Sequence, residues 1–319
     1  MKKTDWTKLS VIFPMTFICC FLWGSAFPSV KIGYKLFSIA SDDQASQLLF
    51  AGARFTLSGI LVLLFGSIGS RRLILPRKSA WKYVFPLALV QTAGQYFFFY
   101  IGLAHTSGVK SSIIVAASTF FAIFFAVFLF HQEVLTAGKL IGCLIGFSGV
   151  VLIQMSGGGP LELSFAPNGE GFILLSAIMY ALSSGMIKNF SRTEDPVTLS
   201  GSQFFAGGLI LIAAGLFLGG RLTPAGPASI LLLLYMAMIS AVAYSLWSVL
   251  LKYNPVSRIT VYGFLNPVIG VILSAVLLGE QNQAFSIYGL ISLLLVSLGI
   301  VIVNKSSGKR YAQTADNLK

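Results

Sequence analysis

Residues 104–142 read AHTSGVKSSIIVAASTFFAIFFAVFLFHQEVLTAGKLIG. A polar turn leads into a long apolar run, a short polar break follows, and a second apolar run begins. Residues 251–289 read LKYNPVSRITVYGFLNPVIGVILSAVLLGEQNQAFSIYG and repeat this order of turn, run, break and run. Gly142 and Gly289 each lie nine residues after the glutamate of the break. The repeated unit is therefore a pair of apolar segments of membrane-spanning length, and it contains no nucleophile–base pair, metal-ligand cluster or phosphate loop.

The composition of the chain excludes a soluble globular domain. Of its 319 residues 56% are hydrophobic and only 10% are charged, whereas a soluble domain carries about 25% charge. Uncharged runs of about 20 residues recur, which is the length that crosses a bilayer as a helix. Membrane β-barrels alternate apolar and polar residues instead. The fold class is an all-α membrane protein, and the net charge of +12 then reports orientation in the membrane, with no nucleic acid expected as a partner.

The apolar runs divide the chain into two groups of five. We expect a first five-helix repeat over residues 1–155, a connecting loop over 156–170, and a second five-helix repeat over 171–304. The loop is rich in glycine and proline, which is typical of a solvent-exposed connection. Residues 305–319 form a polar cytoplasmic tail. The chain therefore has about ten transmembrane helices.

The basic residues are distributed unequally between the two sides of the membrane that these predicted helices define. If the N-terminus lies inside, 17 of the 22 lysine and arginine residues fall on the cytoplasmic side. They are Lys2, Lys3, Lys8, Arg71, Arg72, Arg77, Lys78, Lys82, Lys139, Lys188, Arg192, Lys252, Arg258, Lys305, Lys309, Arg310 and Lys319. This bias predicts a multi-pass protein of the cytoplasmic (inner) membrane with both termini in the cytoplasm.

Five spans is an odd number, so a second copy of the unit must cross the membrane upside down, as an inverted repeat. The chain resembles the drug/metabolite transporter superfamily, and within it the EamA-type family of two five-helix repeats, over about residues 12–304. The resemblance is carried by Trp23-Gly24-Ser25-Ala26-Phe27, Arg54-Phe55, Gln132-Glu133…Gly142…Gly149 and Gly279-Glu280…Gly289…Gly299. Gln132 departs from the pattern, which favours glycine before the glutamate, and the last glycines of the two repeats are offset by about one helical turn.

The resemblance implies a central cavity lined by the first, third and fourth helices of each repeat. Polar or aromatic residues near the middle of those helices are candidate substrate-binding residues: Trp23, Gln91, Gln95, Tyr96, Tyr100, Ser118, Thr119, Tyr180, Tyr244, Trp247 and Asn266. The expected partners are a small-molecule substrate and membrane lipid, with the protein a monomer or homodimer. No cofactor, metal ion or catalytic residue is expected.

Each class of candidate also has a structural interpretation. Gln91 and Gln95 lie four residues apart on one helix face, where they could bind substrate or hydrogen-bond a neighbouring helix. The rings could hold a cationic or planar molecule, or they could pack or form an interfacial belt. Ser118, Thr119 and Asn266 lie mid-helix, and the proline after Asn266 either exposes a carbonyl to substrate or only bends the helix.

Charged residues give two further expectations. Arg54 lies about six residues into its predicted span, so it either reaches the membrane surface as an anchor or contacts an anion or substrate. The acidic residues fall in loops, tails or helix ends. Without a mid-membrane carboxylate, facilitated diffusion or exchange is favoured over proton- or sodium-driven transport. Glu133 and Glu280 are expected to cap the helix that follows each of them.

The sequence predicts a secondary transporter, exporting or exchanging small amphipathic metabolites such as amino acids by alternating access. An importer of an organic cation, such as a quaternary amine bound in the aromatic cavity, is the alternative. A membrane-embedded lipid enzyme is less favoured because His131 with Glu133 is the only acid/base cluster and lacks a nucleophile. A receptor would not require an inverted repeat. Cys19, Cys20 and Cys143 lie inside apolar runs and are expected to be small packing residues.

Overall fold

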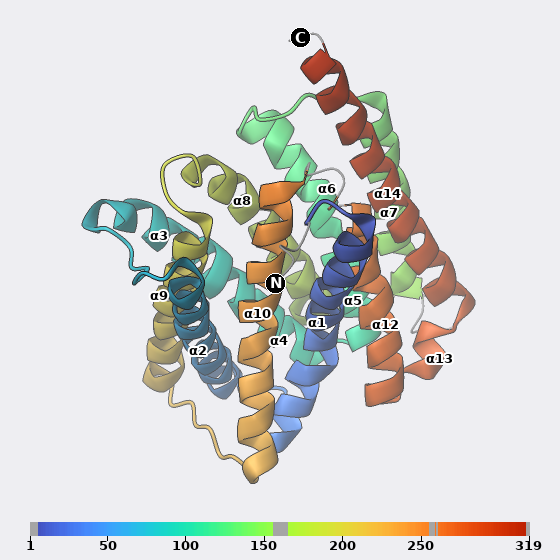
Figure 1. Ribbon diagram of the computed structural model, residues 1–319. Coiled ribbons are helices and arrows are strands. Elements are labelled where there is room, and N and C mark those ends of the chain that lie inside the picture. Colours follow the sequence, from blue (N-terminus) through green and yellow to red (C-terminus); the bar gives the residue numbers. More distant parts are fainter. Residues whose placement is uncertain (1–5, 156–164, 255–258, 260, 317–319) are drawn as a thin grey trace.

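The computed structural model describes residues 6–155, 165–254, 259 and 261–316 (Figure 1). Within these ranges every regular element is helical. Nine of the described helices are long and apolar enough to cross a membrane, and Tyr262–Leu278 is apolar but shorter. The all-α membrane fold with about ten spanning helices is therefore confirmed.

The first repeat contains five spans, three of them interrupted. The first two spans are α1 (Leu9–Leu36) and α2 (Gln44–Ser70). The third span consists of η1 (Lys78–Ala80), α3 (Trp81–Leu87), η2 (Ala88–Gly94) and α4 (Gln95–His105). The fourth consists of α5 (Gly108–Val115), α6 (Ala117–Phe124) and η3 (Phe125–Leu129), and the fifth of α7 (Ala137–Leu152) and η4 (Ile153–Met155). The interruptions in the third and fourth spans fall where the sequence places its candidate site residues.

The second repeat follows the same order. Its elements are η5 (Pro167–Gly171) with α8 (Phe172–Phe190), α9 (Pro196–Phe217), α10 (Pro227–Tyr253), η6 (Val261–Phe264) with α12 (Leu265–Leu278), the short α13 (Gln281–Ala284), and α14 (Ile287–Asp316). The sixth span thus begins at Pro167, inside the expected connecting loop, of which residues 156–164 lie outside the described part. The last helix continues through the expected tail as far as Asp316.

Polar side chains and prolines set where several helices begin. Asp43, Ser107, Thr136 and Asp195 each accept a hydrogen bond from a backbone N–H in the first turn of the helix that follows. Such caps satisfy donors that a helix leaves free at its start. Each polar break contains a residue with positive φ, His131 at 49° and Gly279 at 74°.

Helices α2 and α9, the second spans of the two repeats, pack side by side and antiparallel (Figure 1). A Cβ added at Gly52 would lie 2.6 Å from the backbone N of Ile212, and one at Gly215 would lie 2.7 Å from that of Leu49. Positions early in α2 therefore meet positions late in α9. Because equivalent helices run in opposite directions, the two repeats are inverted relative to each other.

The remaining helix pairs obey the same pseudo-two-fold relation. Helix α1 packs against α10 and α12, and its counterpart α8 packs against α4 and α6. Helices α5 and α12, from the fourth and ninth spans, also pack together. These helix pairs are equivalent with the roles of the two repeats exchanged, and they bring the first, third and fourth spans of both repeats together.

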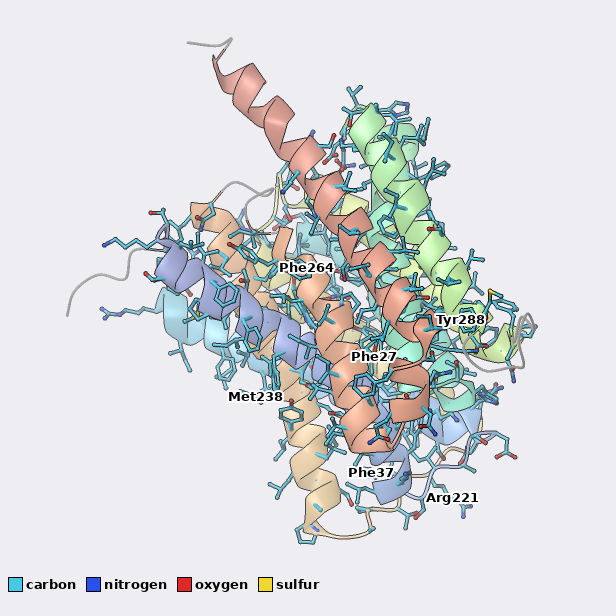
Figure 2. All side chains as sticks on the ribbon, turned by 90° about the vertical axis from the view of Figure 1, so that its right-hand side faces the viewer. Phe27, Phe37, Arg221, Met238, Phe264 and Tyr288 are labelled. Atoms are coloured by element: carbon cyan, nitrogen blue, oxygen red, sulfur yellow. The ribbon has the colours of Figure 1, made fainter. Side chains whose placement is uncertain are left out.

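The fifth and tenth spans, α7 and α14, form a second close antiparallel pair, seen side by side in Figure 2. A Cβ at Gly142 would lie 2.9 Å from the carbonyl oxygen of Gly299. Gly146 lies under the ring of Phe120. These small residues therefore serve helix packing within the fold. Gly289, the sequence equivalent of Gly142, faces the carbonyls of the α13 turn instead, so the repeats are not strictly symmetric here.

Candidate substrate site

Five of the predicted aromatic residues come from the first and third spans of the two repeats and gather in one place. The ring of Trp23 on α1 makes edge-on contacts with Tyr244 at 5.7 Å and Trp247 at 5.1 Å, both on α10. Tyr96 on α4 lies close to Tyr244, and Tyr180 on α8 lies near both. All five rings are half-buried. They form the ring cluster: Trp23, Tyr96, Tyr180, Tyr244 and Trp247.

Tyr100 lies beside this cluster and is completely buried. Its ring is 6.3 Å from that of Tyr96, and its hydroxyl accepts a hydrogen bond of 2.9 Å from Nη1 of Arg54. Its backbone carbonyl accepts from the hydroxyl of Tyr34. Tyr100 therefore joins the ring cluster to the arginine of the second span.

Arg54 is buried inside the bundle, which argues against the alternative in which its side chain reaches the membrane surface as an anchor. Helix α2 begins at Gln44, ten residues before Arg54, which places the arginine about 15 Å along the helix. Only 2% of Arg54 is exposed. Besides Tyr100, it donates to the carbonyl of Met236 at 3.1 Å and to Ser240 Oγ at 3.5 Å, both on α10. The sequence places Arg54 only about six residues into its span because the polar residues 44–47, which also belong to the helix, have no apolar character.

Gln91 and Gln95 both lie on the irregular part of the third span. Gln91 belongs to the π-helical turn η2 and Gln95 opens α4, and both are buried. Their Oε1 atoms have no hydrogen-bond partner among the described residues. The hydrogen bond to the neighbouring helix is made by Thr92, whose hydroxyl donates to Oε1 of Gln203 on α9. The two predicted glutamines therefore present unused acceptors, and π-turns of this kind are frequent at functional sites.

Ser118, Thr119 and Asn266 lie on the fourth and ninth spans, apart from these groups. Ser118 is buried and Thr119 half-buried, just after the junction of α5 and α6. Asn266 follows the tight turn η6, and its Oδ1 has no partner among the described residues. No described contact joins these three side chains to the ring cluster.

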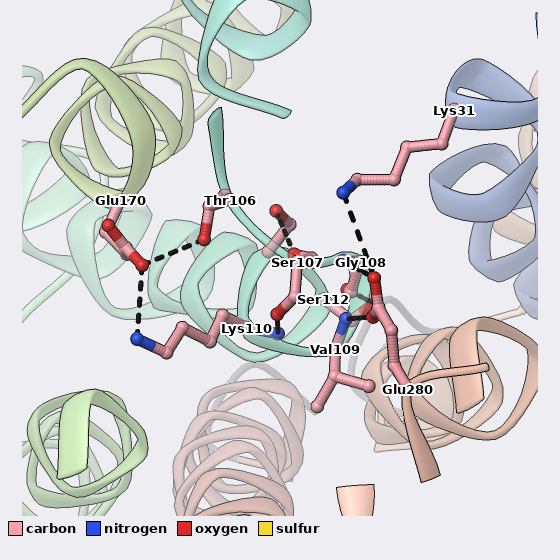
Figure 3. Close-up of polar contacts among 10 residues, drawn as sticks. Lys31, Thr106, Ser107, Gly108, Val109, Lys110, Ser112, Glu170 and Glu280 are labelled. Atoms are coloured by element: carbon pink, nitrogen blue, oxygen red, sulfur yellow. Dashed lines mark hydrogen bonds and ion pairs between the residues drawn. The ribbon is translucent and has the colours of Figure 1, made fainter. Parts of the chain in front are cut away.

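Glu280 makes a contact that the sequence did not predict (Figure 3). Its carboxylate accepts hydrogen bonds from the backbone N–H of Gly108 at 3.0 Å and of Val109 at 2.8 Å, at the start of α5. Lys31 at the end of α1 lies 3.8 Å away. Glu280 was expected to cap the helix that follows it, but it caps the fourth span of the other repeat. The expectation is wrong because the free N–H groups of α5 lie across the repeat boundary.

Next to this contact, Figure 3 shows a buried ion pair between Lys110 and Glu170. Lys110 Nζ lies 3.2 Å from Glu170 Oε1, which also accepts from the hydroxyl of Thr106 at 2.9 Å. The backbone N–H of Ala166 donates to the other carboxylate oxygen. Glu170 was placed in the connecting loop, and its burial was not expected. The only sequence signal was its position just before an apolar run, because the partners lie about 60 residues away.

The end of the fourth span carries the counterpart of the Glu280 contact. Glu133 lies 2.7 Å from Lys139 and 3.7 Å from Lys188 at the end of α8. Gln132, the departure from the family pattern, donates to the carbonyl of Gly185 at 3.1 Å and to Asn189 Oδ1 at 2.8 Å. The cap expected from Glu133 is replaced by these ion pairs. Residues 255–258, which precede the predicted ninth span, lie outside the described part.

These two groups lie on opposite faces of the bundle. Glu280 and Lys31 are at the face where α1 ends, and Glu133 and Lys188 are at the face where α1 begins, here called the terminal face. In each pair a lysine at the end of a repeat's first span meets a glutamate after the other repeat's fourth span. Both cross-repeat ion pairs are formed at the same time in this structure.

Two hollows border the helices of the site. One, of about 200 Å³, lies beside the Lys31 contact and is lined by Tyr34, Leu103 and neighbouring residues of the same face. The other, of about 230 Å³, is lined by phenylalanines of the fourth and fifth spans and by Ile178. Both are smaller than a typical small-molecule site of about 300–1,000 Å³. Neither is lined by a residue of the ring cluster.

An inverted pair of five-helix bundles with an aromatic and polar centre defines a multi-pass membrane transporter. The chain belongs to the EamA-like transporter family, whose model matches residues 11–155 and 167–305. It is similar to an uncharacterized transporter of Archaeoglobus fulgidus, at 26% identity over 89% of this chain and 93% of that protein. The uncharacterized transporter YvbV of Bacillus subtilis is 26% identical over 100% and 99% of the two chains.

Two further comparisons agree with this assignment. The uncharacterized inner membrane transporter YedA of Escherichia coli K12 is 26% identical over 86% of this chain and 85% of YedA. A solved crystal structure with 18% sequence identity superposes with a TM-score of 0.64 over 92% of this chain and 96% of that one. That likeness shows the shared fold.

Proposed function

We propose that the chain is a secondary carrier that exports or exchanges small amphipathic metabolites, such as amino acids, across the cytoplasmic membrane. The observation that carries this proposal is the ring cluster, which forms where the first and third spans of two inverted repeats meet. Substrate sites of inverted-repeat carriers lie at that interface near the middle of the membrane. Aromatic faces with polar hydroxyls suit a molecule that has both an apolar body and a polar group.

The predicted polar residues support the same site. The unpartnered Oε1 atoms of Gln91 and Gln95 are acceptors that a substrate N–H or O–H group can use. A buried polar atom without a partner is unfavourable by about 1–3 kcal/mol, so binding such a donor is favoured there. In the proposed site, the rings hold the apolar part of the substrate and the amides fix its polar part.

Alternating access is supported by the cross-repeat ion pairs on the two faces. When one bundle rocks against the other, the Lys31–Glu280 contact breaks and its face opens. The Lys188–Glu133 contact remains formed and keeps the other face closed. The opposite movement exchanges these roles. The basic residues on the terminal face support its placement in the cytoplasm, so that opening at Glu133 admits substrate from inside the cell.

The charges of the described spans support transport down a gradient or by exchange. Glu170, the most buried acidic residue in the described part of the chain, lies in the first turn of its span and is already paired with Lys110. Many proton- and sodium-coupled carriers place a carboxylate deeper in the membrane than Glu170 lies. The proposed carrier therefore moves substrate without a coupling ion.

Counterflow in proteoliposomes tests the proposal. Labelled tryptophan and other amino acids are offered to vesicles that are empty or preloaded with the same unlabelled compound. Preloading should accelerate uptake with no ion gradient imposed. Trp23→Ala with Tyr244→Ala should abolish the acceleration, whereas Phe128→Ala on an exposed helix surface should leave it intact. Uptake that requires a proton or sodium gradient, or counterflow that survives loss of both rings, would contradict the proposal.

A further inference from the structure

We propose that Arg54 is the receptor for an anionic group of the carried molecule, so that the substrate class is amphipathic carboxylates and zwitterions rather than organic cations. The inference rests on the proposed carrier function and names the substrate class of the same site. It starts from the electrostatic position of Arg54, which is 2% exposed and about ten residues inside α2.

All hydrogen-bond acceptors described for Arg54 are neutral. They are the carbonyl of Met236, the hydroxyl of Tyr100 and, at 3.5 Å, the hydroxyl of Ser240. Within the described part of the chain no carboxylate forms an ion pair with it. A buried charge is normally paired, and an arginine at this depth is unfavourable on insertion scales. The positive charge of the site is therefore uncompensated until an anion arrives.

The guanidinium also has capacity left for a ligand. It carries five N–H groups, and the three described hydrogen bonds use one each. The hydroxyl of Tyr100 accepts from Arg54, and no described acceptor takes its own proton. Arg54 and Tyr100 can together donate to a carboxylate in the forked geometry that arginine favours. The Ser240 contact is the longest of the three and is the one that an incoming oxygen replaces most easily.

The arginine is continuous with the ring cluster. Its guanidinium lies 4.7 Å from the ring centroid of Phe55, which is 3.8 Å from that of Tyr96. The ring of Phe55 also lies 5.5 Å from that of Phe204, which is 5.1 Å from the ring of Tyr244 in the cluster. A molecule whose apolar body lies among the rings thus places a carboxylate toward Arg54. A quaternary amine in the same place meets a fixed like charge, which argues against the cation-importer alternative.

Four compounds on one indole scaffold test the charge preference: indole-3-propionate, tryptophan, 3-methylindole and tryptamine. Their binding is measured by the thermal stability of the purified full-length chain. The anion and the zwitterion should stabilise the protein more than the neutral compound, and tryptamine least. Arg54→Gln should weaken binding of indole-3-propionate about tenfold or more and leave 3-methylindole within about twofold. Arg54→Lys should keep the order, and Arg72→Gln, at an exposed arginine, should change nothing.

Several outcomes overturn the inference. The first is stabilisation by indole-3-propionate that is no greater than stabilisation by 3-methylindole, and the second is tighter binding of tryptamine than of indole-3-propionate. The third is unchanged binding of indole-3-propionate by a folded Arg54→Gln protein. The fourth is a reversed order of the four compounds in Arg54→Lys. Because a structural arginine affects all four compounds alike, charge selectivity separates the two roles. Arg54-dependent binding without flux in vesicles contradicts the carrier function but leaves Arg54 as the receptor for the anionic group of a bound ligand. Flux of tryptamine alone contradicts the inference but leaves the carrier.

Discussion

Glu280 holds three segments together through one carboxylate. Its oxygens accept from two backbone N–H groups of α5 and lie near Lys31 of α1. The helix dipole also favours a negative charge at the start of a helix. The two N–H groups are otherwise free ends of a helix, so loss of the carboxylate leaves them without an acceptor.

We therefore predict that Glu280→Ala lowers the free energy of unfolding by about 1–3 kcal/mol, with a lower thermal midpoint. Asp42→Ala, at an exposed acidic residue of the same face, is the control and should change little. Thermal denaturation of the purified variants measures both. A Glu280→Ala protein as stable as the wild type would show that the contact contributes nothing to the fold.

The two site glutamines should behave differently from a structural glutamine. Gln91→Leu with Gln95→Leu removes buried oxygens that have no described partner, so stability should be unchanged or higher while substrate binding weakens. Gln203→Leu removes the acceptor of Thr92 and should lower stability by about 1 kcal/mol or more. Thermal stability with and without substrate separates the two effects. Strong destabilisation by the Gln91 and Gln95 changes would mean that these amides hold the helices together.

At the scale of elements, the pairing of α2 with α9 depends on backbone contact at glycines. A Cβ at Gly52 would lie 2.6 Å from the backbone of α9, whereas one at Gly69 on the same helix meets nothing within 4 Å. We predict that Gly52→Ala destabilises the protein by about 1–3 kcal/mol. Gly69→Ala should be neutral or stabilising by up to about 1 kcal/mol, because alanine is the better helix former. Equal melting temperatures for the two variants would contradict the packing.

The number, order and class of the elements could be predicted from the sequence because each span must satisfy its own backbone hydrogen bonds within a long apolar run. The ends were less accurate where polar residues continue a helix, as at Gln44 and after Val303. The π-turn at Gln91 was not predicted, since its sequence has the same apolar character as the α-helical turns around it.

Only part of the candidate site could be predicted from the sequence. Trp23 and Tyr244 could each be predicted near the middle of a cavity-lining helix, and the structure brings their rings together. The partners of Glu280 and Glu170 could not be predicted, because they depend on how two repeats meet and lie far away in the chain. The burial of Arg54 was missed by an error of a few residues in one helix boundary, which changed its depth from the surface to the middle of the span.

For the whole molecule, the central claim is that the two repeats open the two faces in turn. The claim joins three features: inverted repeats, a ring cluster between them, and a cross-repeat ion pair on each face. It requires that locking one face shut leaves the ring cluster reachable only from the other face.

Cross-linking with accessibility measurement tests this most directly. Two variants are made in a chain whose native cysteines are changed to alanine, and both carry a cysteine in place of Trp23. One variant also has cysteines in place of Lys31 and Glu280, and the other has them in place of Lys188 and Glu133. A short bifunctional thiol cross-linker closes one face, and an impermeant thiol reagent then probes position 23. With the Lys31–Glu280 face closed, labelling should occur only from the terminal face, and closing the Lys188–Glu133 face should reverse this. Labelling from the same side in both cases, or from neither side, would contradict the account.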